Sequence, residues 1–399
     1  MNNMKKYIEL FFDELEVFED IERGHCYKIF IKQSILAFLD HGTKEAAFAV
    51  YRTFFDSYRI VLAGESNPFI DLLDMLKSYE ENAAVLIDKQ RDHYIHSVNV
   101  FILGLCIYAQ NAKYRAAFNG TVMDKKDYPY SYDTKNEEFF YRWGLASLFH
   151  DVGYPVEIVG RQINKFVDFA TDVDRQSKRV NAQVTFSSFD ELNKIAEIIP
   201  KRDFTKYFFE RYDDSVYIDP LKPVDLLAHK LHTSLCVDLK QMKSALDDFV
   251  HVMARLGFID HGYYSAIIVL KWYGYLIQSA NYKPEYYYEP VLDSAGAILL
   301  HNCYKNMMQK KPFNFGILFA SAYPIAFLLI LCDELQEWNR EAYGIKDKLR
   351  TLTARARLDI SDETLNVTFI SAGNLGLTLR GRRKSCCTDC LILRDYLTR

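Results

Sequence analysis

Apolar residues recur every three or four positions along most of the chain, which is the spacing of amphipathic helices. Turn formers and charges at 119–136 predict a surface loop between two long core helices. The less regular region near 171–225 contains a capped helix ended by proline, and we interpret it as an insertion that shapes a substrate pocket. Helices are predicted over 6–20, 26–40, 44–62, 68–88, 137–160, 259–275, 290–308 and 318–342.

The pattern changes after residue 355. β-branched residues alternate with polar ones in LNVTFISAG and again in LGLTLR, which predicts two short strands. The predicted fold class is therefore predominantly all-α, a helical bundle with a small C-terminal β element. Three parts are expected: an N-terminal helical region at 1–84 that packs on the core, a main domain at 85–342 that carries the insertion, and a tail at 343–399 with the strands.

Composition narrows the class of protein. The 399 residues are 49% hydrophobic, which is enough to bury a large core. Lys and Arg number 49 against 53 acidic residues, and the net charge of -4 does not indicate a nucleic-acid partner. Polar residues interrupt the apolar stretch PFNFGILFASAYPIAFLLILC, so we interpret it as buried core rather than a membrane span. A cytoplasmic protein with no membrane partner is expected.

Acidic residues within the first twenty positions are atypical of a signal peptide. The eight cysteines are scattered rather than arranged as a disulfide framework, so reduced thiols are expected. One C-x-x-C, from Cys387 to Cys390, fits a zinc or redox element, but no second cysteine pair accompanies it. The role of Cys386, Cys387 and Cys390 stays open.

The strongest local motif is Phe149-His150-Asp151-Val152-Gly153-Tyr154-Pro155, at the end of the apolar helix RWGLASLF. Glycine and proline stop the helix there, so an imidazole and a carboxylate lie at a helix end and can bind one cation. The alternative is a hydrogen-bonded helix cap without a ligand. The dipeptide alone does not decide between the two.

Two further segments offer ligands of the same kind. His93 and His96 lie three residues apart at the start of a helix that continues as an apolar run, so at least one of them points inward. Asp333 follows the apolar run YPIAFLLI, where a bare charge is costly to bury, so it should pair or bind metal. Its neighbours Glu334, Glu337 and Arg340 fit a solvated helix face.

In this order and in these helical settings, His96, His150-Asp151 and Asp333 resemble the ligand pattern of the HD superfamily of metal-dependent phosphohydrolases. The resemblance covers about residues 85–342. It implies a helical HD domain, a divalent metal held by these residues, and a nucleotide as the substrate. His and Asp ligands together suit Mn, Fe, Co, Ni or Zn better than Mg alone.

His261 and His301 fall between the His-Asp pair and the last Asp, an order similar to HD members that hold two metals. One or two ions are therefore expected; the alternative for each histidine is a cap or a hydrogen bond within the core. His229 and His232 are weaker candidates for ligands or for outer-sphere or substrate contacts. The expected roles are catalytic for His150, Asp151 and His261, and metal-binding for His96, His150, Asp151, His301 and Asp333.

Tyr154 stands where the GYP subgroup of the family commonly has a lysine, which weakens an assignment to cyclic-di-GMP hydrolysis. Tyr154, Arg161 and Lys165 are candidate substrate-binding residues. Arg161 and Lys165 lie four residues apart and can grip a phosphate, although a solvated helix face explains them as well.

The expected function is metal-dependent hydrolysis of a phosphate ester or anhydride in a nucleotide by a metal-activated water. Two alternatives stay open. One is a dNTP triphosphohydrolase specifically, and the other is a catalytically silent HD nucleotide sensor in a bacterial defence system. The sequence does not name the nucleotide or the metal, and it leaves homo-oligomerisation open.

Overall fold

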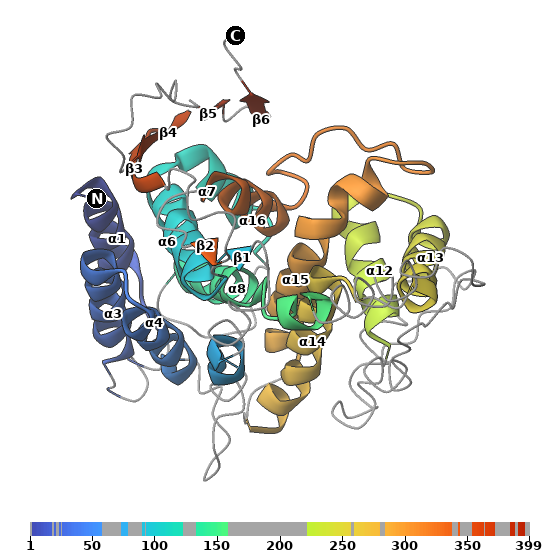
Figure 1. Cartoon of the computed structure of the whole chain (residues 1–399), viewed down its shortest axis with the longest axis horizontal. Helices are drawn as coiled ribbons and strands as arrows, with labels where there is room; N and C mark the ends of the chain where they lie inside the picture. The colour runs from blue at the N-terminus through green and yellow to red at the C-terminus, as the bar shows by residue number, and fades with distance from the viewer. Residues whose placement is uncertain are drawn as a thin grey trace, which may run out of the picture. The chain divides into compact units, whose positions relative to one another are not determined.

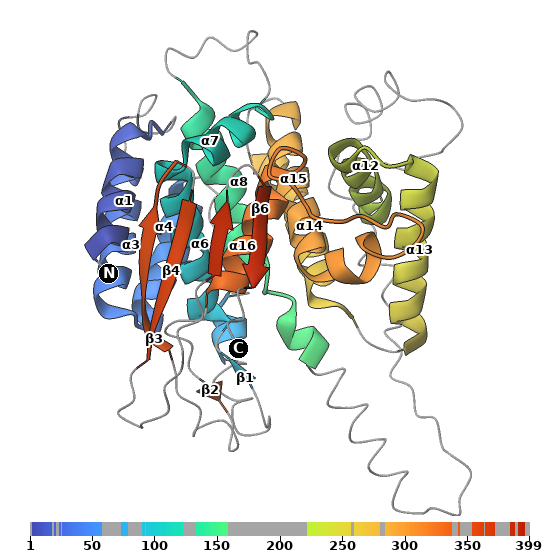
Figure 2. The same ribbon diagram turned by 90° about the horizontal axis from the view of Figure 1, so that it is seen from above.

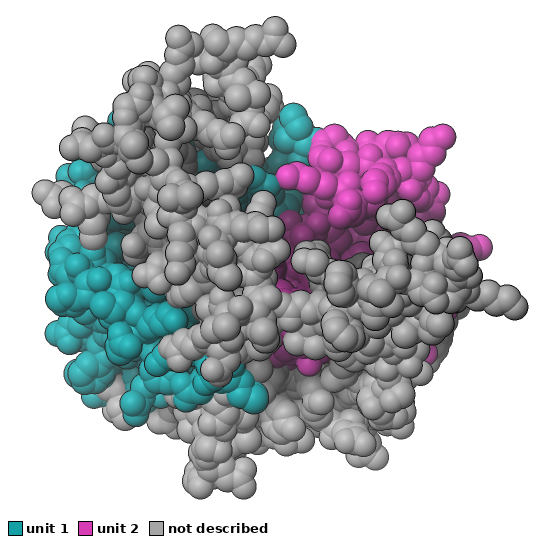
Figure 3. All heavy atoms as spheres, in the orientation of Figure 1, with its two compact units in different colours: residues 1–148, 317–399 teal, residues 149–316 magenta. Residues whose placement is uncertain are grey.

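The computed structural model of the chain is mostly helical, as predicted (Figure 1). Two compact units make up the chain: Met1–Leu148 together with Ile317–Arg399, and Phe149–Gly316 (Figure 3). Each unit is described by itself below, and the three-part division drawn from the sequence stays a prediction. The structure describes residues 2–17, 20, 24, 26–57, 73–78, 90–91, 93–122, 133–158, 222–256, 259–279, 284–336, 342–343, 353–362, 364–371, 384–387 and 390–395.

A nearly all-apolar helix, α6 (Tyr94–Gln110), forms the centre of the first unit, and its residues are buried without a break from Tyr94 to Tyr108. A helix that is apolar on all sides must be covered on all sides. The helices α1 (Asn2–Glu14), α4 (Lys44–Ser57) and α16 (Pro324–Leu335) contact it. The remaining helices of this unit are α3 (Tyr27–His41), α7 (Ala112–Asn119) and α8 (Lys135–Phe149).

Aromatic side chains fix α8 against α6. Trp143 of α8 is fully buried, and its Nε1 donates a hydrogen bond of 2.7 Å to the carbonyl oxygen of Phe101. The indole lies directly over Gly104, where a Cβ atom would come within 2.1 Å of the ring. One turn away, the rings of Tyr108 and Phe139 stack with centroids 3.7 Å apart. The positions of α6 and α8 relative to each other are therefore tightly determined by packing.

The C-terminal tail forms a four-stranded antiparallel sheet in the order of the chain (Figure 2). Leu358, Ile360 and Leu365 of the first two strands are buried, and Asn111 donates a hydrogen bond of 3.0 Å to the carbonyl oxygen of Ser361. The strands are β3 (Thr353–Ile360), β4 (Thr364–Ser371), β5 (Lys384–Cys387) and β6 (Cys390–Asp395); β1 (Gln90–Arg91) and β2 (Ala342–Tyr343) pair separately.

The predicted C-terminal β element is confirmed, and it is larger than expected. The strand predicted in LNVTFISAG is β4, whereas LGLTLR lies outside the described residues. The C-x-x-C motif joins β5 to β6, with Cys387 opposite Cys390 in the register. Five cysteines elsewhere in the described part are free, in agreement with the expected reduced thiols: Cys26, Cys106, Cys236, Cys303 and Cys332.

The second unit is built around two long helices, α14 (His261–Ser279) and α15 (Pro284–Cys303), which pack along each other. They approach closely at Gly262, where a Cβ atom would lie 3.1 Å from the carbonyl oxygen of Ile298. The other helices are α12 (Pro223–Leu235), which contacts α15, α13 (Leu239–Leu256), and the short π-helix η1 (Tyr304–Met308) that continues α15.

Most predicted helices are present, although their ends differ by several residues. The interpretation of residues 312–332 as buried core is partly wrong. Residues from Pro324 onward form the buried helix α16, but Ile317 and Phe319 precede it in an exposed segment, 46% and 43% exposed. The exposed part contains Asn314 and Ser321, whereas the buried run from Pro324 to Cys332 has no charged or amide side chain. The predicted loop at 119–136 falls between α7 and α8, and residues 123–132 within it lie outside the described part.

Among the described residues, no single helix is long and apolar enough to cross a membrane. One bent pair, α6 with α7, meets the length and composition criteria together, with 97° between the two helices. The predicted insertion at 171–225 lies almost entirely outside the described residues.

Candidate metal centre

Two helices of the first unit bring together a histidine and an aspartate that lie far apart in the sequence. His96 occupies the first turn of α6, and Asp333 lies in the last turn of α16. His96 Nε2 is 2.8 Å from Asp333 Oδ1. The histidine side chain is fully buried and the aspartate side chain is 32% exposed. The expectation that Asp333 pairs with another group is confirmed.

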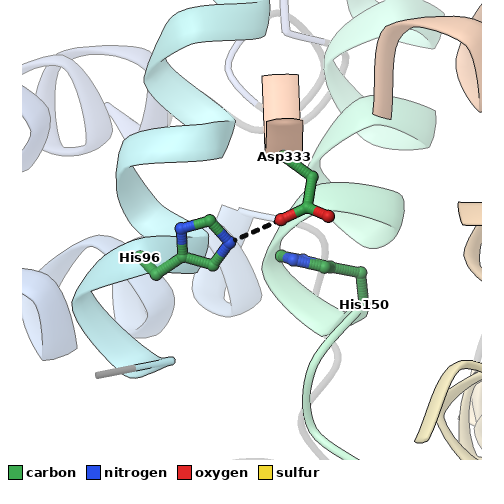
Figure 4. A group of neighbouring side chains, drawn as sticks. All are labelled: His96, His150 and Asp333. Carbon is green, nitrogen blue, oxygen red and sulfur yellow. Dashed lines mark hydrogen bonds and ion pairs between the residues drawn. The ribbon is translucent and has the colours of Figure 1, made fainter. Parts of the chain in front are cut away.

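His150 follows the last residue of α8, the helix that Trp143 locks onto α6. The division between the two units falls just before Phe149, the last residue of this helix. Ligand atoms of His96, His150 and Asp333 lie within 4.8 Å of one another, so the three could hold a metal ion (Figure 4).

A second group forms where α8 ends, within the second unit. His150, Asp151 and His301 present ligand atoms within 4.8 Å of one another. His261, the first residue of α14, adds a third imidazole to the same place: its Nε2 is 3.3 Å from His301 Nε2 and 3.5 Å from Asp151 Oδ1. His301 Nε2 is 4.0 Å from the same carboxylate oxygen. Two imidazole nitrogens and one carboxylate oxygen therefore surround a common point.

The turn that carries Asp151 is held by short contacts to α14. The backbone N–H of Gly153 donates a hydrogen bond of 2.8 Å to Ser265 Oγ. A Cβ at Gly153 would lie 2.5 Å from the carbonyl oxygen of His261, so only glycine allows this approach. Tyr154 places its ring 4.9 Å from that of His261. The sequence motif therefore positions the carboxylate through its glycine as well as through its helix end.

A buried carboxylate holds the far side of the His261 ring. Glu157, whose side chain is 3% exposed, accepts hydrogen bonds through one oxygen from His261 Nδ1 at 2.6 Å and from the His261 backbone N–H at 2.9 Å. Because Nδ1 carries the hydrogen in this contact, the lone pair of the neutral ring is on Nε2. Nε2 is the atom that faces Asp151 and His301.

The other two histidines are oriented in the same sense. His96 Nδ1 faces the amide oxygen of Gln336, and His301 Nδ1 faces the carbonyl oxygen of Ile298. Both oxygens are acceptors, so each Nδ1 donates and each Nε2 carries the lone pair. All three rings therefore direct an Nε2 lone pair toward a carboxylate oxygen. Lone pairs and negative charge at such separations repel one another unless a cation lies between them.

The electrostatics of His261 point to the same need for positive charge. Burial by itself lowers the pKa of this histidine, but the hydrogen bond to Glu157 and the charges of Asp151, Glu157 and Asp260 outweigh burial and raise the pKa to about 9. Without a metal, a second proton on the ring supplies the cation. Because a metal binds only the deprotonated nitrogen, it takes the place of that proton.

The donor set fits a divalent metal of the first transition series. Imidazole nitrogens mixed with carboxylate oxygens suit Mn, Fe, Co, Ni or Zn, whereas Mg prefers oxygen alone. His96, His261 and His301 also have the outer hydrogen bond that metal-ligating histidines almost always make. The structure thus contains two clusters of His and Asp side chains that could hold a metal. All five residues predicted from the sequence as metal ligands belong to these clusters. His261, predicted as catalytic, lies beside the second cluster.

Sequence reasoning missed the residues behind the ligands. Glu157 and Gln336 were not singled out, although both lie within six residues of a predicted ligand. A glutamate in the otherwise apolar context GYPVEIV was the one signal that could have pointed to Glu157, because a buried carboxylate needs partners. Arg161 and Lys165, proposed for substrate binding, lie outside the described residues, as do Glu337 and Arg340.

His229 and His232 lie on α12 and are part of neither group of possible ligands found among the described residues. His232 Nδ1 contacts the carbonyl oxygen of Val237. Burial, followed by the nearby positive charges of His232 and Lys230, lowers the pKa of His229 to about 4. His229 is therefore neutral at physiological pH.

This shift predicts a pH effect on stability. Because the folded-state pKa of His229 is below the ordinary 6.5, its contribution is complete above pH 6.5 and is lost as the pH falls toward 4. The free energy of unfolding should fall by up to about 1.4 kcal/mol per pH unit in this window from His229 alone. The His229→Gln variant should lose that part of the slope in urea unfolding measured from pH 7 to 4.5. His251→Gln, at an exposed position on α13, controls for loss of a histidine as such; equal slopes in wild type and His229→Gln would contradict the prediction.

No protein-family model, curated protein or solved structure matches this chain.

Proposed function

We propose that this chain is a divalent-metal-dependent phosphohydrolase of the HD type, which hydrolyses a phosphate ester or anhydride of a nucleotide. The single observation that carries the proposal is the convergence of three Nε2 lone pairs on carboxylate oxygens, with every Nδ1 tied to an acceptor.

The proposed ligands fall into two sets. His96, His150 and Asp333 form the first, and Asp151, His261 and His301 complete a second around the same His-Asp turn. His261, expected from the sequence to be catalytic and a candidate ligand of a second metal, is assigned to the second set. A divalent ion bound here would lower the pKa of a bound water and polarise a phosphoryl oxygen.

The side chains around the ligands have separate tasks in this proposal. Asp151 supplies the negative charge that attracts the ion, and its Oδ1 is the oxygen nearest to His261 and His301. Glu157 keeps the proton of His261 on Nδ1 and away from the ligating atom. Tyr154, which is partly exposed beside the His261 ring, is the described residue best placed to contact a substrate.

Two tyrosines near the ligand-bearing helix starts are not placed to contact a substrate. Tyr94 and Tyr263 are fully buried, and Tyr94 stacks on Tyr51 with centroids 4.9 Å apart, so both are packing residues. The nucleotide as substrate therefore comes from the resemblance of the ligand pattern to the HD superfamily, many of whose members hydrolyse nucleotides.

Metal analysis and an activity screen test the proposal together. Protein dialysed against Mn²⁺, Co²⁺ or Ni²⁺ should retain one or two ions per chain, measured by elemental analysis. The same protein should release phosphate, triphosphate or a nucleoside monophosphate from at least one of dNTPs, NMPs, cyclic mononucleotides and cyclic dinucleotides. Protein that retains none of the three metal ions after dialysis would refute the proposal.

The screen also separates the alternatives. Release of triphosphate from dNTPs would identify a dNTP triphosphohydrolase, while cleavage of cyclic substrates would identify a phosphodiesterase. A nucleotide that binds the metal-loaded protein and is recovered intact would favour the catalytically silent sensor.

A further inference from the structure

The three oriented histidines differ in the chemistry of their outer partner. His96 faces a neutral amide oxygen of Gln336, and His301 faces a neutral backbone oxygen. Of the three, only His261 faces a carboxylate through its Nδ1. A neutral acceptor fixes the orientation and tautomer of the ring, whereas a carboxylate also adds electron density to the ligating nitrogen and attracts the cation through its charge.

Glu157 is firmly placed for this task. Its side chain is 3% exposed, and the oxygen that accepts from His261 Nδ1 also accepts from the His261 backbone N–H at the start of α14. Burial strengthens the interaction, since little water screens it. By contrast, Gln336 is fully buried beside His96 and carries no charge.

We infer that the two ligand sets differ in metal affinity because their outer partners differ. Glu157 is a positioning residue that makes the Asp151–His261–His301 set the tighter metal site, and this set fills before the His96–His150–Asp333 set. The inference rests on the proposed metal centre and adds an order of loading to it. A first ion held by the tight set stays bound at low metal concentration, and occupancy of the weaker set then follows the metal supply. Loading of the second set would be the regulated step.

Calorimetric titration of the metal-free full chain with Co²⁺ tests this order. To assign each affinity to a set, the titration is repeated in two backgrounds: His96→Ala, which leaves the Glu157-backed set, and His301→Ala, which leaves the Gln336-backed set. In the first background, Glu157→Gln should weaken Co²⁺ binding by about 10- to 100-fold, the range typical of lost outer-sphere partners. In the second background, the same substitution should change nothing.

The reciprocal substitution gives a readout that structural damage cannot mimic. Gln336→Glu in the His301→Ala background should tighten Co²⁺ binding, and Glu157→Gln combined with Gln336→Glu in the full chain should reverse the order of loading. The absorption bands of Co²⁺ report the coordination of each ion as it binds. Thermal melts of every variant identify any that fail to fold, and Glu14→Gln, an exposed glutamate paired with Arg115, is the matched control.

The outcomes separate the inference from the proposed function. If wild-type protein binds no Co²⁺, the metal centre itself is refuted. If Co²⁺ binds but Glu157→Gln leaves its affinity in the His96→Ala background within twofold of the parent, the centre stands and the inference is overturned. An unchanged affinity in folded Gln336→Glu would overturn it as well.

Discussion

Replacing Asp151 with asparagine is expected to lower turnover by at least about a thousandfold while the helical fold persists. Asp151 Oδ1 is within 4.0 Å of the Nε2 atoms of both His261 and His301, and it is the charged member of that set. Loss of a ligand charge removes several kcal/mol of stabilisation from a metal-assisted reaction, and each 1.36 kcal/mol is tenfold in rate. The measurement is kcat on the nucleotide identified in the screen, with far-ultraviolet circular dichroism for the fold.

A second readout checks the geometry without any turnover. Because the Asp151 charge is among the interactions that raise the pKa of His261 to about 9, the Asp151→Asn variant should lower that pKa in the metal-free protein. Nuclear magnetic resonance titration of the His261 ring measures it. Asp40→Asn, at an exposed surface pair with Lys5, is the matched control. Wild-type turnover in Asp151→Asn would remove this site from the reaction.

Replacing Gly104 with alanine is expected to destabilise the first unit by about 2 kcal/mol. Overpacking of a rigid core costs up to about 3 kcal/mol, and alanine gains about 1 kcal/mol of helix propensity over glycine. A Cβ here would lie 2.1 Å from the Trp143 ring. The ring cannot retreat without losing its hydrogen bond to Phe101. Because unfolding entropy is about 2.1 cal/mol/K per residue, the melting temperature of a chain of this size should fall by roughly 2–3 °C.

The packing of Trp143 on Gly104 also positions the ligands, since α6 carries His96 and α8 ends just before His150. Metal affinity should therefore fall with stability in Gly104→Ala, which calorimetry and Co²⁺ titration measure separately. Gly120→Ala is the matched control, because a Cβ there would meet nothing closer than 3.5 Å. A melting temperature of Gly104→Ala equal to that of the control would contradict the packing argument.

The sequence predicted the parts of the fold that depend on local spacing. Apolar residues every three or four positions predicted helices, because a helix needs such an apolar stripe whatever core it packs against. The His-Asp turn was also recognised from local sequence, because the glycine and proline that follow His150 and Asp151 end the helix at their own positions. Periodicity did not predict where the apolar stretch at 312–332 changes from exposed segment to buried helix, since burial depends on what else packs there.

The tertiary structure alone decided which atoms of the predicted ligands face one another. His96 and Gln336 are 240 residues apart, and Glu157 and His261 are 104 apart, so neither hydrogen bond leaves a trace in local sequence pattern. The first contact forms only when α6 and α16 have packed, and the second only when the turn after α8 has packed on the start of α14. Each contact fixes which nitrogen of its ring carries the lone pair. The sequence by itself thus determines which residue types are present for a metal centre. The orientation that allows them to bind a cation arises from long-range packing, because the direction of a hydrogen bond depends on both of its partners.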